Sequence, residues 1–381
     1  MAQDKNKTIP NVPPLRFPGF TDNWKSFSLS HFFDFKNGLN PEAKRFGEGT
    51  KFISVSDILN NDYINYDNIR ASVRASDKDL SEFGVNQGDI LFQRSSETLE
   101  DVGRANVYID DRTALFGGFV IRGKKKREYE PHFMRYALSS PINRKKIIVK
   151  GAGAQHFNIG QEGLSKVIIN TPGILEQTKI GLLLQQIDER IATQNKIIDN
   201  YLSFLKGLTK TQTHRGEPNT RISDSLECHT STLQEGGLNE SGKYPVYGAS
   251  GIAGYLDEYK CNEDAILVIK DGSGVGTVSY ATGEYSVIGT LNYLTAKSRY
   301  SLKYLYFCLM GFNFEPFKTG MAIPHIYFRD YGQVKIYCPS IQEQEHIAKA
   351  LTTIENKINI EKQLLKSLYM EKQYLLNKMF I

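Results

Sequence analysis

Two stretches of the chain repeat one pattern of apolar positions. A shift of 167 residues, from Pro172 to Pro339, aligns them without a gap. In both, apolar residues recur at steps of three, four or seven, as along the seam of a coiled-coil helix. The first seam consists of Ile180, Leu184, Ile187, Ile191, Ile198, Tyr201, Leu205 and Leu208, and the second of Ile347, Leu351, Ile354, Ile358, Leu365, Leu368 and Leu375. A proline before each stretch is a helix-start signal, so we predict long helices over 172–214 and 339–381.

Each predicted seam needs a partner. A coiled coil between two copies of the chain is one solution. We favour pairing within one chain, because a single molecule already carries two matched seams. Each helix follows its own globular segment, so an antiparallel pair would place the two segments at opposite ends. Lys372 interrupts the second seam, and Gln194 and Glu361 are polar seam positions, again 167 residues apart.

The segments before the helices combine strand and helix patterns. The same offset places Gly153 on Gly320 and Ile159 on Ile326, so the duplication covers about half the chain each time. Strand patterns are KFISVSDI, GDILFQ and ANVYID in the first copy and DAILVIK, GTVSYA and YSVIGT in the second. Helical patterns are PHFMRYALSSPINRKKIIV and LKYLYFCLM. We predict an α/β (α+β) fold with a pseudo-two-fold internal repeat: an N-terminal segment (1–24), similar domains (25–171 and 215–338), and spacer helices (172–214 and 339–381).

Composition is that of an ordinary globular protein, with 381 residues, 40% hydrophobic and 23% charged. The net charge is +5, but Lys and Arg outnumber Asp and Glu by 22 to 18 in residues 25–170 and fall short by 11 to 13 in residues 215–338. The four cysteines are far apart and form no C-x-x-C pair. No apolar run approaches the ~18 residues of a membrane helix, and the N-terminus has no signal-peptide pattern. We therefore expect a cytoplasmic protein with free thiols.

Patterns that would carry chemistry are weak. The glycines of KDGSGVGTV, residues 270–278, imitate a phosphate loop, but such loops run from a strand into a helix. The residues that follow are β-branched and aromatic, so we predict a turn between strands. Asp34, Glu42 and Lys44 imitate a nuclease cluster only loosely, and the histidines have no metal-ligand spacing. We expect no catalytic residue, metal or cofactor in this chain.

Several motifs together resemble the specificity subunit of type I restriction–modification systems (HsdS-like). They are P-x-I/L-x-E-Q at the start of both helices, the opening VPPLRFPGFTDNWKSFSL, and the segments GDILFQRSS, DAILVIKDGSG, GAGAQHFNI and KTGMAIPHI. The resemblance covers nearly the whole chain. It implies two target-recognition domains, each reading one half of a bipartite site in double-stranded DNA. The helix pair would set the spacer between the half-sites and dock the modification subunits.

The resemblance also implies that this chain has no chemistry of its own. Methylation would belong to the modification (methyltransferase) subunits, two in number, which bind the methyl donor. Cleavage would belong to an ATP-dependent, translocating restriction subunit. The alternatives are a freestanding nuclease or methyltransferase, and a coiled-coil scaffold without a role on DNA.

Candidate DNA contacts lie in loops and basic runs. Arg and Gln can read base edges in the major groove, and basic runs suit phosphates, which position a protein without specifying sequence. The loop candidates are Arg94, Ser95, Ser96, Lys150, Gln155 and His156 in the first domain and Lys270, Ser273, Lys318, Met321 and His325 in the second. The phosphate candidates are Lys124, Lys125, Lys126, Arg127, Arg144 and Lys145.

Overall fold

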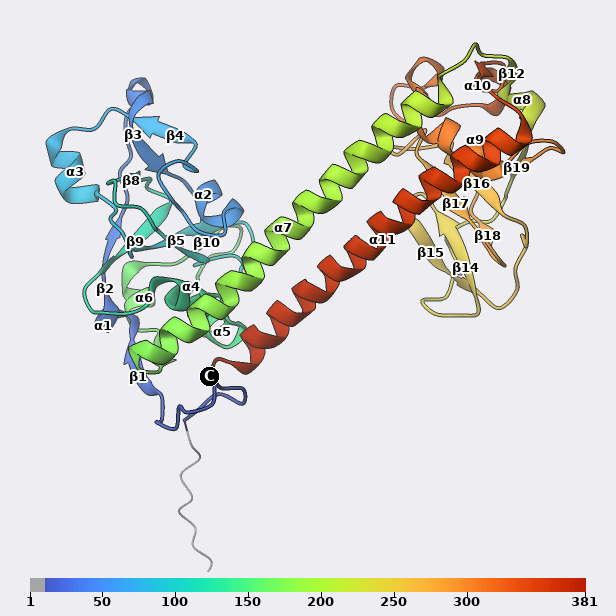
Figure 1. The fold of residues 1–381 in the computed structure, drawn as a ribbon. Helices are drawn as coiled ribbons and strands as arrows, with labels where there is room; N and C mark the ends of the chain where they lie inside the picture. The colour runs from blue at the N-terminus through green and yellow to red at the C-terminus, as the bar shows by residue number, and fades with distance from the viewer. Residues whose placement is uncertain (1–10) are drawn as a thin grey trace, which may run out of the picture. The chain divides into compact units, whose positions relative to one another are not determined.

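A computed structural model describes residues 11–381 of the chain and divides it into two units. Unit 1 ends at Gln194 and also includes Leu364–Ile381, whereas unit 2 is Asn195–Gln363. In Figure 1, unit 1 runs from blue to green and ends in red, and unit 2 runs from green through yellow to red. Residues 1–10, to which the signal-peptide prediction applies, lie outside the described residues.

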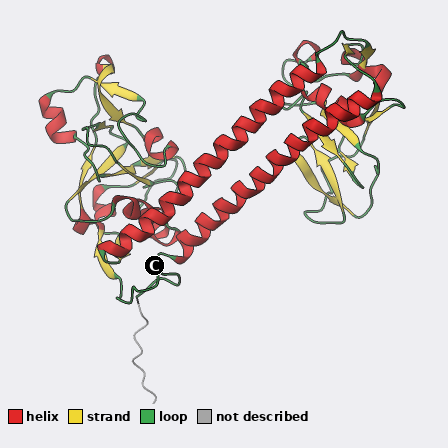
Figure 2. Cartoon of the chain, in the orientation of Figure 1, coloured by secondary structure: helices red, strands yellow, loops and turns green. Residues whose placement is uncertain are grey.

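Unit 1 is built from short strands and helices around two sheets (Figure 2). Its elements are β1 (Lys25–Ser28), α1 (Leu29–Phe32), β2 (Phe33–Asn37), η1 (Ala43–Arg45), β3 (Phe46–Ile53), α2 (Val55–Asn60), β4 (Ala71–Val73), α3 (Asp77–Phe83), β5 (Ile90–Gln93), β6 (Ser95–Ser96), β7 (Ala105–Val107), β8 (Leu115–Phe116), β9 (Val120–Lys125), α4 (Pro131–Ser139), α5 (Pro141–Ile148), β10 (Phe157–Asn158), α6 (Gln161–Ser165) and β11 (Ile168–Thr171). One sheet has the order β2-β9-β5-β7 and is antiparallel, and the other has the order β4-β3-β8, with β3 and β8 parallel.

Unit 2 repeats this plan with fewer helices. Its elements are β12 (Thr220–Arg221), α8 (Ile222–Ser225), β13 (Leu226–Thr230), β14 (Tyr244–Gly248), β15 (Gly251–Leu256), β16 (Ala265–Ile269), β17 (Val278–Ala281), β18 (Ser286–Val287), β19 (Leu291–Ala296), α9 (Leu302–Met310), η2 (Glu315–Phe317), α10 (Phe328–Tyr331) and β20 (Lys335–Ile336). The antiparallel sheet has the order β13-β19-β16-β17, and the second sheet has the order β15-β14-β18, with β14 and β18 parallel.

Strand order therefore matches between the units element by element. The pair β1–β11, which joins the start of unit 1 to the strand before its long helix, corresponds to β12–β20 in unit 2. The predicted internal repeat of two mixed domains is confirmed. The predicted turn between strands in residues 270–278 is also confirmed, because β16 and β17 flank it and pair antiparallel.

Two predicted elements are wrong in extent. The pattern KFISVSDI predicts one strand, but β3 ends at Ile53 and α2 follows. The backbone N–H of Ser54 donates to the Asp57 carboxylate at 2.7 Å in a capping box, which starts a helix where the pattern predicts strand. The helical pattern that begins at Pro131 divides into α4 and α5, because Pro141 removes a helical N–H and suits the first turn of a new helix.

Two long helices, α7 (Ile174–Thr213) and α11 (Ile341–Lys378), carry the predicted seams. In unit 1, the first part of α7 and the last part of α11 pack into one apolar cluster that includes Trp24, Phe133 and Phe380. In unit 2, the last part of α7 packs with the first part of α11 against α9. The helices therefore pair within one chain and run antiparallel, as predicted.

Lys372, which interrupts the second seam, has a charged partner on α7. Lys372 Nζ lies 2.5 Å from the Asp188 carboxylate, which also accepts from Tyr136 Oη at 2.7 Å and lies 3.2 Å from Arg135. Burial raises the pKa of Asp188, but the hydrogen bond and charge of Lys372 hold it below its ordinary value. In unit 2 the equivalent residue is Glu355, which accepts from Tyr306 Oη at 2.6 Å and pairs with Lys303 at 3.0 Å.

The Glu-Gln pair at the start of each long helix joins that helix to its own domain. In unit 1, Gln177 accepts from the backbone N–H of Glu130, the N-cap of α4, at 3.1 Å and donates to the carbonyl of Pro172 at 2.9 Å. In unit 2, Gln344 accepts from the N–H of Ser301, the N-cap of α9, at 3.0 Å and donates to the carbonyl of Pro339 at 2.8 Å. The preceding glutamates pair with arginines: Glu176 with Arg16, and Glu343 with Arg215. The repeated motif is thus a repeated joint between helix and domain.

Candidate nucleic-acid interface

Two of the predicted segments meet in unit 1. Strand β6, which holds Ser95 and Ser96, pairs antiparallel with β10, at the end of the GAGAQHFN hairpin. The Ser95 hydroxyl donates to the side-chain oxygen of Asn158. Ser95 and Ser96 therefore lie opposite Asn158 and Phe157, although the two strands are some 60 residues apart in the chain. Sequence reasoning treated the two segments as separate loops, and the strand pairing shows that the segment with Ser95 and Ser96 adjoins the hairpin that carries Gln155 and His156.

Arg94 sits at the junction of three loops. Its backbone N–H donates to the carbonyl of Phe119 at 2.9 Å, and its carbonyl accepts from the N–H of Ile159 at 3.0 Å. One guanidinium nitrogen approaches the carbonyl of Gly118 at 3.3 Å, and the side chain is half-buried. These backbone hydrogen bonds fix the position of Arg94. Among the described residues, only one nitrogen of its guanidinium has a hydrogen-bond partner, so most of the N–H donors are available.

The hairpin beside Arg94 depends on one glycine. Gly153 has a φ of +143°, and a Cβ there would lie 2.0 Å from the carbonyl oxygen of His156. Only glycine allows this close approach, which turns the chain back so that Ala152 and Asn158 form a β-bridge. Gln155 and His156 are exposed at the tip, and Lys150 is exposed just before the hairpin.

Unit 2 has the same junction. The N–H of Lys270 donates to the carbonyl of Thr290 at 3.0 Å, and its carbonyl accepts from the N–H of Ile326 at 3.0 Å. A Cβ on Gly320, whose φ is +87°, would lie 2.4 Å from the carbonyl oxygen of Ile323. We call this arrangement the loop platform: in unit 1 it consists of Arg94, Phe119 and residues 153–156, and in unit 2 of Lys270, Thr290 and residues 320–323.

The other candidates in unit 2 surround its platform. His325 forms a β-bridge with Asp271, and its Nδ1 lies 3.8 Å from the Asp271 carboxylate. Lys318 forms an ion pair with Glu315 at 2.5 Å. Met321 is fully exposed at the hairpin tip, and Ser273 is exposed in the glycine-rich turn. The structure therefore gathers all five predicted residues of unit 2 around two adjacent loops.

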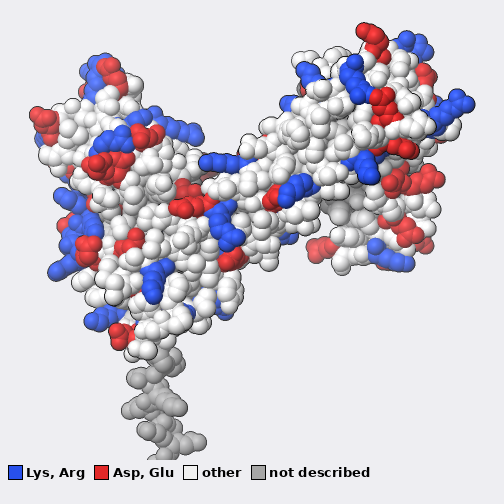
Figure 3. Space-filling model, in the orientation of Figure 1, with Lys and Arg blue, Asp and Glu red and all other residues white. Residues whose placement is uncertain are grey.

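The Lys124–Arg127 run lies at the end of β9, beside β2. Lys125 forms an ion pair with Glu128 at 3.0 Å, and Lys126 forms one with Asp34 at 3.0 Å. Figure 3 shows Lys and Arg side chains interspersed with Asp and Glu on the drawn face of both units. The Lys126–Asp34 pair is exposed and contributes little to stability, so Lys126 is able to exchange its carboxylate for another anion. Lys125 is only 26% exposed, and its ammonium also lies 5.1 Å from the centre of the Tyr129 ring.

Arg144 has a place within the fold. Its guanidinium donates to the carbonyls of Glu100 and Val102, each at 2.8 Å, and burial lowers its pKa to about 10. It holds the loop after β6 against α5. Lys145, on the same helix, is exposed. Asp34, Glu42 and Lys44 do not form a cluster, because Asp34 pairs with Lys126 while Glu42 pairs with Lys44.

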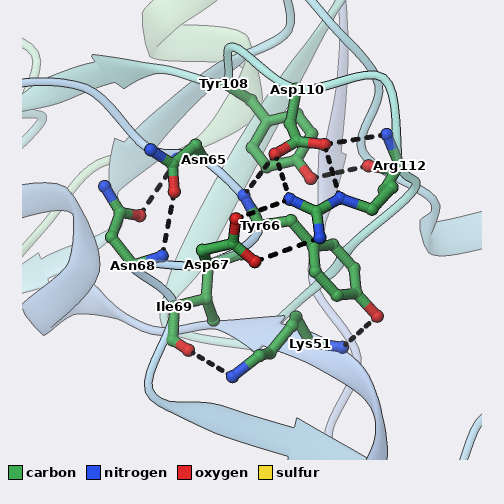
Figure 4. Close-up of polar contacts among 9 residues, drawn as sticks. All are labelled: Lys51, Asn65, Tyr66, Asp67, Asn68, Ile69, Tyr108, Asp110 and Arg112. Carbon is green, nitrogen blue, oxygen red and sulfur yellow. Dashed lines mark hydrogen bonds and ion pairs between the residues drawn. The ribbon is translucent and has the colours of Figure 1, made fainter.

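Sequence reasoning missed a charged cluster around Arg112. Figure 4 shows its guanidinium between Asp67, at 2.9 Å, and Asp110, also at 2.9 Å, while its carbon Cζ lies 4.5 Å from the centre of the Tyr66 ring. The hydrogen bond from Arg112 is the main cause that holds the pKa of Asp110 far below its ordinary value. Both sides of the guanidinium are occupied, so Arg112 fixes residues 65–69 to the turn after β7. No spacing in the sequence indicates this contact.

A family described as the type I restriction modification DNA specificity domain matches residues 21–200 and 221–370. The chain belongs to this family. The two matched stretches carry the two loop platforms and the two long helices, so each copy of the family's domain comprises one mixed domain and most of one helix. The family membership predicted from the helix-start motif, the N-terminal opening and the strand-and-loop segments is confirmed.

Curated relatives of this family align at low identity. The specificity subunit of the type I restriction enzyme EcoKI from Escherichia coli K12 is 24% identical over 52% of this chain, and that alignment spans 46% of the relative, less than half its length. The MjaVIII specificity subunit from Methanocaldococcus jannaschii is 21% identical over 98% of this chain and 95% of its own. A crystal structure of the S subunit from Mycoplasma genitalium is 18% identical, covers 97% of this chain and 99% of its own, and superposes with a TM-score of 0.64, which shows the shared fold.

Neither a metal centre nor a membrane span accompanies the loop platforms. Within residues 11–381, no group of three or more His, Cys, Asp and Glu side chains is arranged to hold a metal ion. The helices described there include none with the length and apolar character needed to cross a bilayer.

Proposed function

We propose that this chain is the DNA sequence-recognition subunit of a type I restriction–modification complex. Each unit reads one half of a bipartite site in double-stranded DNA through its loop platform. The observation that carries the proposal is the repeated junction that fixes the backbone of Arg94 in unit 1 and Lys270 in unit 2. A basic side chain on a rigid backbone, beside an exposed hairpin, suits contacts with base edges and phosphates.

The long helices are proposed to set the number of base pairs between the half-sites. Helices α7 and α11 each have one end in each unit, so they form the connection between the two units. Residues added to both helices would lengthen this connection. Their outward faces would dock two modification subunits. Methylation would occur in those subunits, which bind the methyl donor, and ATP-driven cleavage in a restriction subunit.

The basic run at Lys124–Lys126 is proposed to contact phosphates. Replacing the three lysines by alanine should weaken binding to all duplexes alike. The log–log slope of affinity against salt should become shallower by about 0.9 for each phosphate that the variant no longer neutralises. Arg144 is left out of the proposed interface because its guanidinium is engaged by two backbone carbonyls.

The function is tested by mapping methylated sites in cells that carry the modification subunits with and without this chain. We expect one bipartite sequence to be methylated only when the chain is present. Exchanging residues 25–170 for the first domain of another family member should change one half of that sequence and leave the other half intact. Loss of both halves together, or methylation without the chain, would refute the proposal.

The spacer is tested by lengthening both helices in phase. Seven residues added between Gln194 and Tyr201, with seven between Glu361 and Leu368, preserve the seam and add roughly 10 Å, the rise of seven helical residues. On B-DNA this corresponds to about three base pairs. We expect unchanged half-sites with a wider gap between them. New half-sites with an unchanged gap would contradict a spacer role.

A further inference from the structure

The two loop platforms share a backbone but differ in where they expose apolar surface. In unit 1 the large apolar residue is Phe119, on the turn between β8 and β9, and 69% of it is exposed. The equivalent residue in unit 2 is Thr290, whose hydroxyl is buried. In unit 2 the apolar residues are Met321, fully exposed, and Ile323, 62% exposed, both on the hairpin.

The turns are equivalent because each carbonyl, of Phe119 or Thr290, accepts from the N–H of the basic residue, and the hairpins are equivalent by the offset of the duplication. Shifting by 167 residues places Met321 on Ala154 and Ile323 on His156. One platform therefore combines an apolar turn with a polar hairpin, and the other combines a small polar turn with an apolar hairpin. Single exposed apolar residues are common on protein surfaces. Here, however, each unit carries one on a loop that is tied to the basic position: the carbonyl of Phe119 accepts from the N–H of Arg94, and the hairpin with Met321 is closed between Thr319 and His325, next to Ile326, whose N–H donates to the carbonyl of Lys270.

Resting on the DNA-recognition function proposed above, we propose that Phe119 and Met321 are specificity-determining residues, each of which contacts the C5 methyl group of a thymine in its half-site. Arg94 and Gln155 belong to the side-chain types that read base edges bidentately in the major groove. The thymine methyl is the apolar group that base pairs present in that groove, so it is the group that an apolar side chain beside Arg94 meets there. Wedge residues that part base steps act instead from the minor groove.

The two hairpins would therefore make different kinds of contact with DNA. In unit 1 the tip carries Gln155 and His156, which form hydrogen bonds, and the methyl contact comes from the turn. In unit 2 the tip itself makes the methyl contact, and Lys270 at the junction supplies the charge. This division agrees with the second unit's lower content of basic residues, because an apolar contact adds discrimination without adding charge.

Deoxyuridine tests the contact directly, because it differs from thymidine only in lacking the methyl group. The chain in complex with its modification subunits would be titrated with duplexes that carry the mapped site, in which each thymine is replaced singly by deoxyuridine. We expect one position in each half-site where binding weakens roughly fourfold, the change associated with burying one methyl group. Phe119→Ala should abolish this sensitivity in the half-site that follows the exchange of residues 25–170, and Met321→Ala should abolish it in the other half-site.

Matched controls separate the contact from general effects. Met321→Leu should retain the sensitivity. Ile168→Ala and Ile252→Ala remove apolar side chains that are 55% and 52% exposed outside the platforms, one in each unit, and should leave it unchanged. Unfolding curves would confirm that all variants are folded.

Three results would overturn the inference. They are a half-site without thymine, binding that is indifferent to deoxyuridine at every position, and alanine variants that lose affinity equally on both kinds of duplex. A rise in 2-aminopurine fluorescence on binding would instead identify Phe119 or Met321 as a wedge between base steps. Failure of the DNA-recognition function itself gives a different result, because the wild-type complex would then bind mapped and scrambled duplexes equally.

Discussion

Replacing Lys372 by methionine should destabilise unit 1. The change keeps the apolar stem but removes the ammonium group 2.5 Å from the Asp188 carboxylate, whose side chain is only 7% exposed. Breaking a buried ion pair costs about 3–5 kcal/mol, because it leaves a charge without compensation. Arg135 and Tyr136 still contact Asp188 in the variant. We therefore expect the free energy of unfolding to fall by a smaller amount, about 2 kcal/mol.

Trp24 reports this change locally. It is the only tryptophan of the chain and lies in unit 1, so tryptophan fluorescence reports the unfolding of unit 1 and not that of unit 2. It is 2% exposed and lies in the same apolar cluster as Leu368 and Leu375, which flank Lys372 on α11. Denaturant titration of the full chain, followed by Trp24 emission, should show an earlier midpoint for the variant. A local probe is needed because the two units are able to unfold separately.

A double-mutant cycle isolates the ion pair. Asp188→Asn should be less harmful in the Lys372→Met background than in the wild type, because the two groups contact each other. Lys357→Met is the matched control: Lys357 is 47% exposed, pairs with Glu361 at 2.6 Å, and lies in unit 2. It should leave the Trp24 midpoint in place. An unchanged midpoint for Lys372→Met, or strictly additive effects in the cycle, would refute the reasoning.

The same pair predicts a pH dependence. The pKa of Asp188 is lowered in the folded chain, so its contribution to stability is present above the ordinary Asp pKa of about 3.9 and is lost as the pH falls through the folded value. The difference in stability between wild type and Lys372→Met should therefore shrink in acid. A difference that grew as the pH fell would contradict the sign of this linkage.

Three further changes test other parts of the structure. Gly153→Ala or Gly320→Ala should abolish recognition of one half-site without moving the Trp24 midpoint, whereas Gly160→Ala should be silent because a Cβ there meets nothing within 4 Å; methylation mapping checks both. Gln177→Ala should lower the free energy of unfolding reported by Trp24 by about 1–2 kcal/mol, because the N–H of Glu130 is left unpaired, and Gln344→Ala should leave the Trp24 midpoint unchanged. Arg112→Lys removes the two-sided engagement of Asp67 and Asp110, so limited proteolysis should cut residues 61–70 faster.

The parts of the fold that could be predicted from sequence are those whose contacts repeat. The seams of α7 and α11, the Glu-Gln joints and the strand patterns occur twice, so a second copy supports each interpretation. The strand prediction failed at Ser54, because the carboxylate of Asp57 accepts from the Ser54 N–H and starts a helix within a strand-like run. The Asp188–Lys372 pair was not predicted either. In the sequence Lys372 only interrupts the apolar seam, because the carboxylate that pairs with it lies on the other helix.

The candidate site was predictable only as a set of loops. Residues 95–96 and the hairpin that ends at 157–158 are joined by the pairing of β6 with β10, and no periodicity in two-residue strands indicates such a pairing. The cluster around Arg112 depends on three segments that meet only after folding. Arg144 looked like a phosphate contact in sequence because its engagement by backbone carbonyls is a tertiary feature.

The duplication itself separates structural from functional positions. Where the two copies keep one interaction, as at Gln177 and Gln344, a side chain satisfies backbone groups of its own unit, and any replacement leaves a buried N–H or carbonyl unpaired. Where they differ, as at Phe119 and Thr290 or at Ala154 and Met321, the backbone beneath is held by the same hydrogen bonds and the side chain is free to vary. A subunit whose two units read different half-sites needs that combination: identical junctions to hold the loops, and unlike side chains at their tips. The positions at which the copies disagree on a shared backbone are therefore the first positions to exchange when the aim is a new half-site in an unchanged scaffold.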